Sequence, residues 1–241
     1  MCGRLAQATA PWKVQEFVPV THELHRKPHY NLAPAQRLAA LRQASNRSLV
    51  WALLKWGLVP AWAKTPRTAY KMINAKAETL AEKSAFRAAY RHRRCIIPAD
   101  GFYEWRQENQ RKQPYFIHYH DNSPLFLAGL WETWQNAGQT LETCAIVTTV
   151  ANAQIRPLHS RMPLIFSWEQ AERWLDCTPH SDDELKSLLC CIPDRPLVID
   201  PVSTRVNKPS FDEPACFQPD PAGSAGDEKP GFQIGDRRQG T

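Results

Sequence analysis

The sequence predicts an α+β fold in which a mainly antiparallel, curved sheet or open β-barrel-like core carries short flanking helices. Segments of strand composition outnumber helical ones, and the two kinds do not alternate as they would in a parallel α/β fold. Hydrophobic residues make up 43% of the 241 residues, enough for a sizeable core. No linker-like stretch divides residues 1–217, so we expect one domain there. The Gly-, Pro- and Asp-containing remainder, residues 218–241, is expected to be a disordered tail.

Strands are expected where β-branched and aromatic residues gather between turn-forming residues. The expected ranges are residues 37–42, 49–56, 95–105, 114–120, 124–131, 144–150, 163–166 and 197–204. The first two ranges are expected to pair around a turn at Ser45 and Asn46. Pro98 and Gly101 indicate a bend or bulge inside the third range.

Helices are expected to be few. Residues 11–17 are predicted to form a short helix with Thr9 as its cap. Residues 76–94 are predicted to be helical because they are rich in Ala, Glu, Lys and Arg. Two further short helices are expected behind capping boxes, which are formed by Ser167 with Gln170 and by Ser181 with Glu184.

The charge distribution favours a polyanionic partner. The formal net charge is +6, and cations crowd one segment that only Glu78 and Glu82 oppose. The cations of this segment are Lys64, Arg67, Lys71, Lys76, Lys83, Arg87, Arg91, Arg93 and Arg94. They form either a solvated helix face or a surface that contacts phosphates.

The cysteines indicate a reducing environment. There are seven, an odd number, and none forms a C-x-x-C pair. No apolar run follows the first residues as it would in a signal peptide or a membrane span. We therefore expect an intracellular protein with free thiols and no membrane association, located in the cytoplasm or nucleoid if the source is bacterial.

Cys2 is the first candidate for chemistry. Removal of Met1 would leave Cys2 with two nucleophiles on adjacent carbons, its α-amine and its thiol. The amine has an ordinary pKa of about 8, so a useful fraction is neutral at physiological pH and can attack a carbonyl. The thiol can then close onto the imine carbon to form a five-membered thiazolidine. On its own, a cysteine at this position is more often incidental.

Six sequence blocks, in order, carry a family resemblance. They are Met1-Cys2-Gly3-Arg4, Tyr30-Asn31-Leu32-Ala33-Pro34, Lys55-Trp56-Gly57-Leu58-Val59-Pro60 to Trp62, Ile73-Asn74-Ala75-Lys76-Ala77-Glu78-Thr79, Cys95-Ile96-Ile97-Pro98-Ala99-Asp100-Gly101-Phe102-Tyr103-Glu104-Trp105 and His159-Ser160-Arg161-Met162-Pro163. The sequence resembles the SRAP family of SOS response-associated peptidases, which sense abasic sites by crosslinking to DNA. One block would be weak evidence, whereas six in order are very specific.

The resemblance implies the catalytic roles. Cys2 would bond to the ring-opened sugar aldehyde of an abasic site, and Asn74 would position the terminal amine and the sugar. Glu104, which lies among aromatic residues in the sequence, would move protons. His159 would assist sugar opening and later reversal. Taken alone, Asn74 fits a turn cap equally well, Glu104 also fits a salt-bridged structural glutamate, and an isolated histidine such as His159 is more often an ordinary surface or core residue.

The resemblance also implies a DNA-binding set. The set comprises Arg4, Asn31, Trp62, Lys76 and Arg161. Trp62 would stack on a base or wedge a strand junction, although Ala63 puts a double-Trp wedge in doubt. Lys76 stands where many relatives have Arg, so it offers a point charge in place of a fork. The partner would be single-stranded DNA with abasic sites, including single-strand to double-strand junctions, and the protein is expected to be a monomer without a cofactor.

Other chemistries find less support. His118 and His120 alternate on a strand and could chelate, but no acidic or thiolate residues are spaced to complete a metal site. There is no nucleophile elbow and no Gly-rich phosphate loop. Two alternatives stay open: a thiol peptidase that processes its own N-terminus, and a noncatalytic module that binds single-stranded DNA. Weak lyase activity and slow self-reversal are also expected from imine chemistry.

Overall fold

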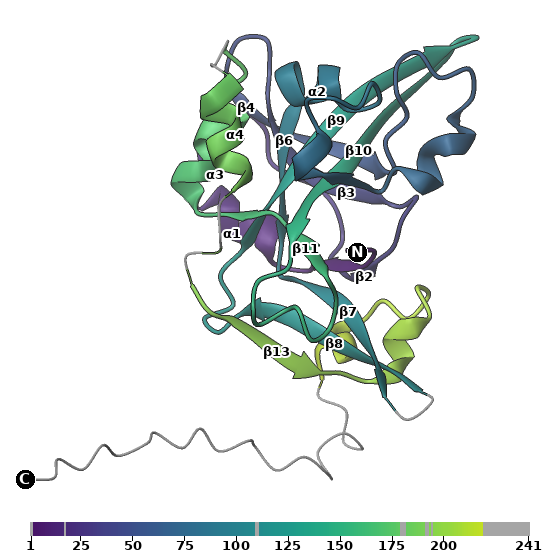
Figure 1. Cartoon of the computed structure of the whole chain (residues 1–241), viewed down its shortest axis with the longest axis vertical. Coiled ribbons are helices and arrows are strands. Elements are labelled where there is room, and N and C mark those ends of the chain that lie inside the picture. Colours follow the sequence, from purple (N-terminus) through teal and green to yellow (C-terminus); the bar gives the residue numbers. More distant parts are fainter. Residues whose placement is uncertain are drawn as a thin grey trace, which may run out of the picture.

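The computed structural model contains two sheets that meet near the N-terminal segment (Figure 1). It describes residues 2–218 apart from residues 17, 109–110, 179–181, 191–192 and 194. The α+β class predicted from the sequence is confirmed, and so is the mainly antiparallel, barrel-like core.

The larger sheet closes into a five-stranded barrel. Its strands are β3 (Arg37–Gln43), β4 (Leu49–Trp56), β6 (Arg94–Ala99), β9 (Leu125–Asn136) and β10 (Gln139–Val150). They pair in the ring order β10-β4-β3-β6-β9-β10, and only the β10–β4 contact is parallel. Three short strands extend the ring: β5 (Asn74–Lys76) and β11 (Arg161–Pro163) on β10, and β12 (Ile165–Phe166) on β9.

The smaller sheet has the order β13-β8-β7-β1-β2. Its strands are β1 (Leu5–Gln7), β2 (His29–Leu32), β7 (Gly101–Glu108), β8 (Arg111–Tyr119) and β13 (Leu197–Pro201). The chain passes from β6 of the barrel to β7 of this sheet at Asp100, within the predicted bend. Gly101 is needed there because a Cβ atom would lie 2.6 Å from the carbonyl oxygen of Ile117.

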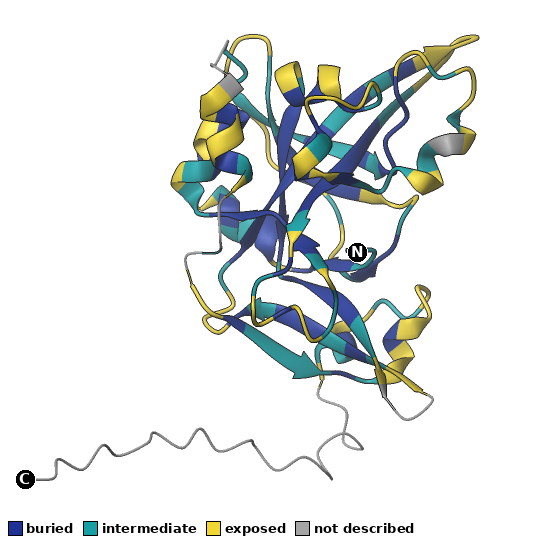
Figure 2. Cartoon of the chain, in the orientation of Figure 1, coloured by how far each residue is buried: buried dark blue, intermediate teal, exposed yellow. Residues whose placement is uncertain are grey.

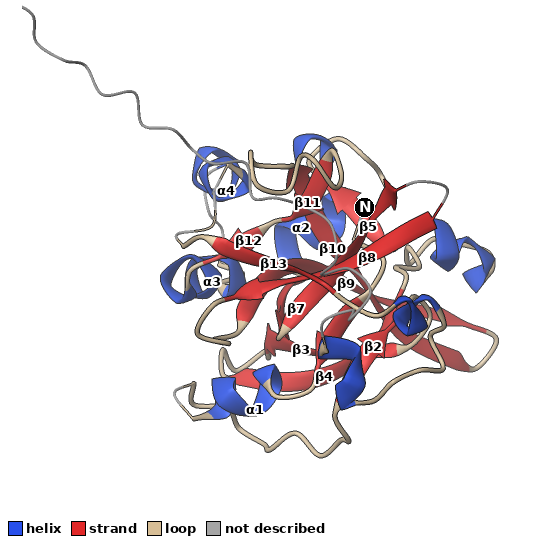
Figure 3. Cartoon of the chain, turned by 90° about the horizontal axis from the view of Figure 1, so that it is seen from below, coloured by secondary structure: helices blue, strands red, loops and turns tan. Residues whose placement is uncertain are grey.

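Short helices lie around the sheets (Figure 3). The α-helices are α1 (Ala10–Gln15), α2 (Arg87–His92), α3 (Trp168–Leu175) and α4 (Asp182–Leu189), and the 3₁₀ helices are η1 (Pro66–Lys71), η2 (Ala77–Thr79), η3 (Thr204–Asn207) and η4 (Pro214–Phe217). Among the described residues, no helix is both long and apolar enough to cross a membrane.

The core runs through both sheets, where the strands are mostly buried (Figure 2). One cluster joins barrel residues such as Leu54 and Ile146 to Leu5 and Phe102 of the smaller sheet, and it includes Cys2. Apolar burial of this kind is the main driving force for folding. It also fixes the N-terminal segment between the two sheets.

The helix predicted over residues 76–94 is wrong for most of its length. The segment begins with the end of β5, passes through η2, and is α-helical only in α2. The cause is tertiary: Lys76, the last residue of β5, pairs with Thr148 of β10, and Ala77, Leu80 and Phe86 are buried in one core cluster. Packing of this kind overrides a local helix propensity of a few tenths of a kcal/mol per residue.

Helix caps were predicted with mixed success. The capping box at Ser167 is present and opens α3. Thr9 precedes α1 as expected, but its side chain does not cap the helix. The carboxylate of Asp100 instead accepts the backbone N–H groups of Ala8 and Ala10, at 2.5 and 3.0 Å. Ser181 and residues 219–241 lie outside the described residues, so the second cap and most of the tail stay predictions.

Candidate active site around Cys2

Cys2 is held in the interior, at the entry to β1. Its relative exposure is 0%, and it packs in the core cluster shared by the two sheets. β1 lies between β2 and β7, and the backbone N–H of Tyr103 donates to the Arg4 carbonyl at 3.0 Å. The position of Cys2 is therefore set by a sheet, which places a reactive group more accurately than a free terminus would.

The Cys2 thiol is neutral at physiological pH. Burial raises the pKa of this thiol well above its ordinary value, and the nearby Glu104 carboxylate raises it further. A hydrogen bond from the Arg4 backbone acts in the opposite direction but is weaker. The thiol is thus a poor nucleophile until a base removes its proton.

Asn74 contacts Cys2 directly. Its Nδ2 donates to the Cys2 carbonyl oxygen at 2.8 Å. β5 fixes this geometry because Asn74 is in register with Ile146 of β10. Asn74 Oδ1 is buried and has no hydrogen-bond partner in the described part of the chain. An unsatisfied buried acceptor is costly, so this oxygen is suited to receive a donor from a ligand or an amine.

Glu104 reaches the same region from β7. Strand alternation puts it on the face of Phe102, which packs in the cluster of Cys2, whereas Tyr103 and Trp105 point into a different cluster. Only 4% of Glu104 is exposed. Of the aromatic residues beside Glu104 in the sequence, Phe102 alone therefore shares its face.

His159 is half-buried in the loop before β11. Its Nδ1 lies 2.9 Å from the backbone nitrogen of Arg161 and 3.1 Å from the Arg161 carbonyl oxygen. A neutral ring can accept the N–H at Nδ1 and keep its proton on Nε2, and a protonated ring can donate from Nδ1 to the carbonyl. The backbone N–H and carbonyl of Arg161 can therefore bond to His159 in its neutral and in its protonated form, respectively, which suits a residue that exchanges protons.

Arg161 is engaged by Glu78, a residue to which the sequence analysis gave no role. The guanidinium donates to both carboxylate oxygens of Glu78, at 2.6 and 2.9 Å, and to the Thr148 carbonyl at 2.6 Å. The Arg161 hydrogen bond lowers the pKa of Glu78. This bidentate ion pair links the β5–η2 segment, which carries Asn74, to the loop that carries His159.

The half-buried Arg4, just before β1, and the buried Asn31 of β2 form a polar pair. Arg4 Nη1 donates to Asn31 Oδ1 at 2.7 Å and to the Val206 carbonyl at 2.6 Å. Asn31 is fully buried, and its Nδ2 donates to three backbone carbonyls between residues 206 and 211. Burial does not favour direct DNA contact by Asn31, but it makes Asn31 the support that orients Arg4. Burial also lowers the pKa of Arg4.

The predicted basic cluster divides into exposed and internal cations. Lys76 is exposed and shares a face of β5 with Asn74. Arg94 is only 1% exposed and donates to carbonyls, among them that of Tyr90 at 2.9 Å, and Arg93 pairs with Glu132 at 2.6 Å. Both of these cations are therefore engaged within the fold, and Arg94 is too buried to belong either to a solvated helix face or to a phosphate-contacting surface.

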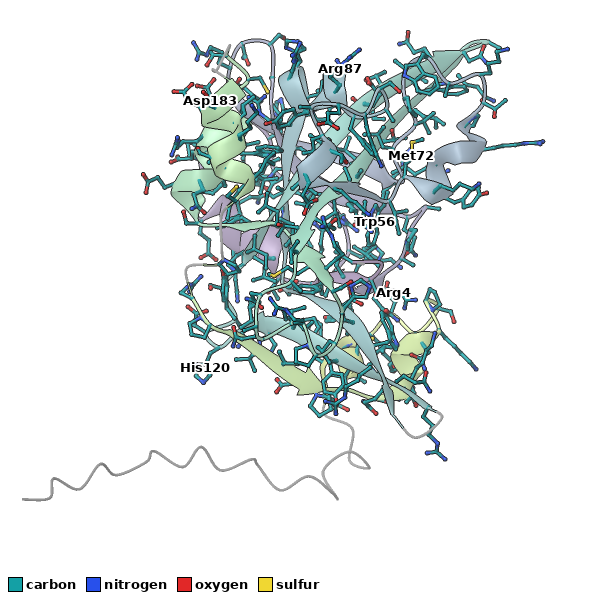
Figure 4. The ribbon with its side chains drawn as sticks, in the orientation of Figure 1. Arg4, Trp56, Met72, Arg87, His120 and Asp183 are labelled. Atoms are coloured by element: carbon teal, nitrogen blue, oxygen red, sulfur yellow. The ribbon has the colours of Figure 1, made fainter. Side chains whose placement is uncertain are left out.

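A hydrogen bond joins Asn74 to Cys2, and Glu104 lies near enough for its charge to raise the pKa of the Cys2 thiol. Trp62 is 65% exposed in the loop after β4, as expected for a stacking residue. In Figure 4, Arg4 lies at the level where the barrel meets the smaller sheet, and Trp56 lies above it in the barrel. Trp56 Nε1 donates to the Ile73 carbonyl at 2.9 Å, which ties β4 to the residue before Asn74.

Comparison with known proteins assigns the family. The model described as SOS response associated peptidase (SRAP) matches residues 1–209, and the chain belongs to this family. The resemblance found in the sequence blocks is thereby confirmed.

Several relatives are similar over most of their length. The chain is 39% identical over 218 residues to the abasic site processing protein YoaM of Bacillus subtilis, covering 87% of this chain and 94% of the relative. It is 30% identical over 264 residues to the abasic site processing protein HMCES of Xenopus tropicalis, covering 90% and 78%. It is 32% identical over 183 residues to the abasic site processing protein YedK of Escherichia coli, covering 73% and 79%.

Solved structures share the fold. A crystal structure of a protein from Bacteroides thetaiotaomicron superimposes with a TM-score of 0.79 at 24% identity, covering 91% of this chain and all of that chain. A second, from Bordetella bronchiseptica, has a TM-score of 0.67 at 30% identity, covering 83% and 94%.

Proposed function

We propose that this protein processes abasic sites in single-stranded DNA by forming a thiazolidine between Cys2 and the ring-opened deoxyribose. The observation that carries the proposal is the buried Cys2 thiol beside Glu104, with the Cys2 carbonyl held by Asn74. The family, and relatives named abasic site processing proteins, support the substrate class.

The amine attacks first. The raised pKa keeps the Cys2 thiol protonated, whereas a free α-amine, with an ordinary pKa of about 8, is partly neutral at physiological pH. Met1 must be removed to free this amine. The amine nitrogen adds to the aldehyde carbon, and the carbinolamine loses water to give an imine. Asn74 Oδ1, buried without a partner among the described residues, is suited to accept an N–H of the amine.

Ring closure follows within the same residue. Glu104 takes the thiol proton, sulfur bonds to the imine carbon, and the proton is passed to nitrogen. The net reaction joins aldehyde and cysteine with loss of one water. Intramolecular closure is strongly favoured, because effective molarities of about 10⁵ M are attainable. An imine that fails to close would undergo β-elimination, which breaks the DNA strand. We therefore also expect weak lyase activity.

His159 opens the sugar. Proton transfer to the ring oxygen and from the anomeric hydroxyl converts the closed sugar to the aldehyde. A ring whose Nδ1 has a backbone partner in either protonation state can perform both transfers. Reversal uses the same groups in the opposite direction. Lys76 and Arg4 would contact phosphates, and the protein is proposed to act as a monomer, also at single-strand to double-strand junctions.

The test is intact mass after mixing with single-stranded DNA that contains one abasic site. Wild-type protein lacking Met1 should give the sum of the protein and DNA masses less one water, stable to denaturation without borohydride. Cys2→Ala should give none of this product. Cys2→Ser should give an adduct only when borohydride traps the imine. Cys190→Ala, which removes an exposed cysteine, is the matched control and should crosslink normally.

The same experiment separates the alternatives. A thiol peptidase needs an activated thiolate, which the raised pKa of Cys2 does not favour. A plain binding module would bind DNA equally well with Cys2→Ala and give no covalent mass with any variant. Absence of the covalent product from wild type with confirmed Met1 removal would overturn the proposal.

A further inference from the structure

The segment between β4 and β5, residues 58–73, forms an arm with exposed aromatic side chains. Among the described residues, three large hydrophobic side chains are exposed, and two of them belong to this arm. The exposed fraction is 65% for Trp62 and 69% for Tyr70. Exposed aromatic rings are suited to stack on the bases of a single nucleic-acid strand. The family resemblance implies that Trp62 contacts DNA, whereas no sequence motif assigns a role to Tyr70.

The backbone of the arm is fixed, so these side chains are held outward on a rigid support. At its base, the N–H of Leu58 donates to the Met72 carbonyl at 3.0 Å. Near its tip, Trp134 Nε1 donates to the Ala63 carbonyl at 2.6 Å, and Asn136 Nδ2 donates to the Lys64 carbonyl at 3.0 Å. In Figure 4, Met72 marks the base of the arm, and the side chains of the arm project away from the barrel.

The arm carries only positive charge. From Gly57 to Ala77 the sequence contains Lys64, Arg67, Lys71 and Lys76 and no acidic residue. Within the described part of the chain, Lys64, Arg67 and Lys71 form no ion pair. The two glutamates of the neighbouring β9–β10 hairpin, Glu132 and Glu142, are already paired with Arg93 and Arg42. Cations interleaved with aromatic rings fit the phosphates and bases of a single strand.

Tyr70 and Lys71 are arranged as a unit. Lys71 Nζ lies 5.5 Å from the centroid of the Tyr70 ring. A nucleotide whose base stacked on the Tyr70 ring would therefore have the Lys71 ammonium group close enough to contact its phosphate. Four residues further on, Asn74 bonds to Cys2, so the arm leads directly into the reactive site.

We propose that Tyr70 is a second stacking platform, in addition to Trp62, for a base of the single-stranded DNA that flanks the abasic nucleotide, with Lys71 at the adjoining phosphate. The inference rests on the proposed function and extends it by a binding site for undamaged nucleotides. Because position 63, beside Trp62, is Ala63, Tyr70 would supply the second aromatic ring of this arm.

Binding is measured by fluorescence anisotropy with a thymidine oligonucleotide that has no abasic site, so that no covalent step contributes. Tyr70→Ala should weaken affinity about five- to a hundredfold, as expected for loss of one stacked base. Tyr70→Phe keeps the ring and should bind like wild type. Lys71→Ala should reduce the slope of log affinity against log salt by about one, whereas Lys112→Ala, an exposed lysine on β8, should not.

A second measurement uses unaltered protein. Photocrosslinking to an oligonucleotide containing 5-iododeoxyuridine should join DNA to the peptide that carries Tyr70. Equal affinity of wild type and Tyr70→Ala, or photoproducts that never include this peptide, would overturn the inference. The proposed function is tested separately, because Tyr70→Ala keeps Cys2 and should reach the full yield of covalent product at saturating DNA containing an abasic site.

Discussion

At the residue scale, the Glu78–Arg161 ion pair joins the segment that carries Asn74 to the loop that carries His159. Glu78 follows Asn74 closely in the chain, and Arg161 holds the ring of His159 through its backbone. The pair spans 83 positions of sequence. Neither the spacing nor the composition of the chain predicts such a contact, although Glu78 lies within one of the family blocks.

Glu78→Gln should lower stability at neutral pH by about 1 kcal/mol or less, because much of Glu78 is exposed and solvent screens the pair. The Arg161 hydrogen bond lowers the pKa of Glu78. The folded state therefore favours the charged form, so this stabilisation is present above the ordinary pKa of 4.5 and is lost as pH falls below it. Urea unfolding of both proteins across this range should show the difference shrinking in acid.

Glu82→Gln is the matched control for Glu78→Gln, since Glu82 is an exposed glutamate of the same segment. It should leave unfolding unchanged at neutral pH. If Glu78→Gln and Glu82→Gln behaved alike at every pH, the ion pair would have no energetic role in the fold.

Asn74→Ala tests the contact with Cys2. It removes the donor to the Cys2 carbonyl, and loss of a partner by a buried polar group costs about 1–3 kcal/mol. When this loss is expressed in the transition state, the crosslinking rate at saturating DNA should fall about 5- to 150-fold. Affinity for undamaged DNA should stay the same. Rapid quenching and denaturing gels measure the rate, and an unchanged rate would remove Asn74 from the mechanism.

At the element scale, the sequence predicted strands better than helices. Strand composition marked the barrel strands, and Pro98 with Gly101 located the turn from one sheet to the other. The prediction failed over residues 76–94 because distant contacts decide this segment: Lys76 pairs with Thr148 of β10, and packing holds Leu80 and Phe86 in a core cluster. The site residues came from family blocks, and the roles of Glu78 and Tyr70 needed the three-dimensional arrangement.

Gly57→Ala tests how the barrel supports the arm. Gly57 directly follows β4 with φ +125°, and a Cβ there would lie 2.6 Å from the Ala69 carbonyl oxygen in η1. The substitution should cost about 1–3 kcal/mol and shift η1, so that it weakens DNA binding as Tyr70→Ala does. Calorimetry and anisotropy measure the two effects.

Gly138→Ala is the control for Gly57→Ala. Gly138 also has a positive φ, +80°, but a Cβ there meets nothing within 4 Å. It should show backbone strain without loss of DNA affinity. Normal DNA binding by Gly57→Ala would mean that the packing of Gly57 on Ala69 does not position the arm.

At the scale of the whole molecule, buried thiols connect the reactive residue to the stability of the core. Burial raises the pKa values of Cys2, Cys95 and Cys144 above the ordinary value of 9.0. All three belong to the cluster that runs between the barrel and the smaller sheet. The environment that keeps the Cys2 thiol neutral is thus a property of the whole core, whereas Asn74 and Glu104 add local positioning.

Alkaline unfolding should report these thiols. A raised folded pKa means that only the unfolded chain ionises as pH rises above about 9, so stability is complete below that pH and falls above it. Each thiol should contribute a slope of about 1.4 kcal/mol per pH unit. Between pH 9 and 10 the unfolded thiol is only partly ionised, so Cys144→Ala should reduce the slope there by about 1 kcal/mol per pH unit. Cys190→Ser, at an exposed site, should not change it. Guanidinium unfolding at several pH values measures the slope, and equal slopes for Cys144→Ala and wild type would show that the Cys144 thiol ionises as readily in the folded core as in the unfolded chain.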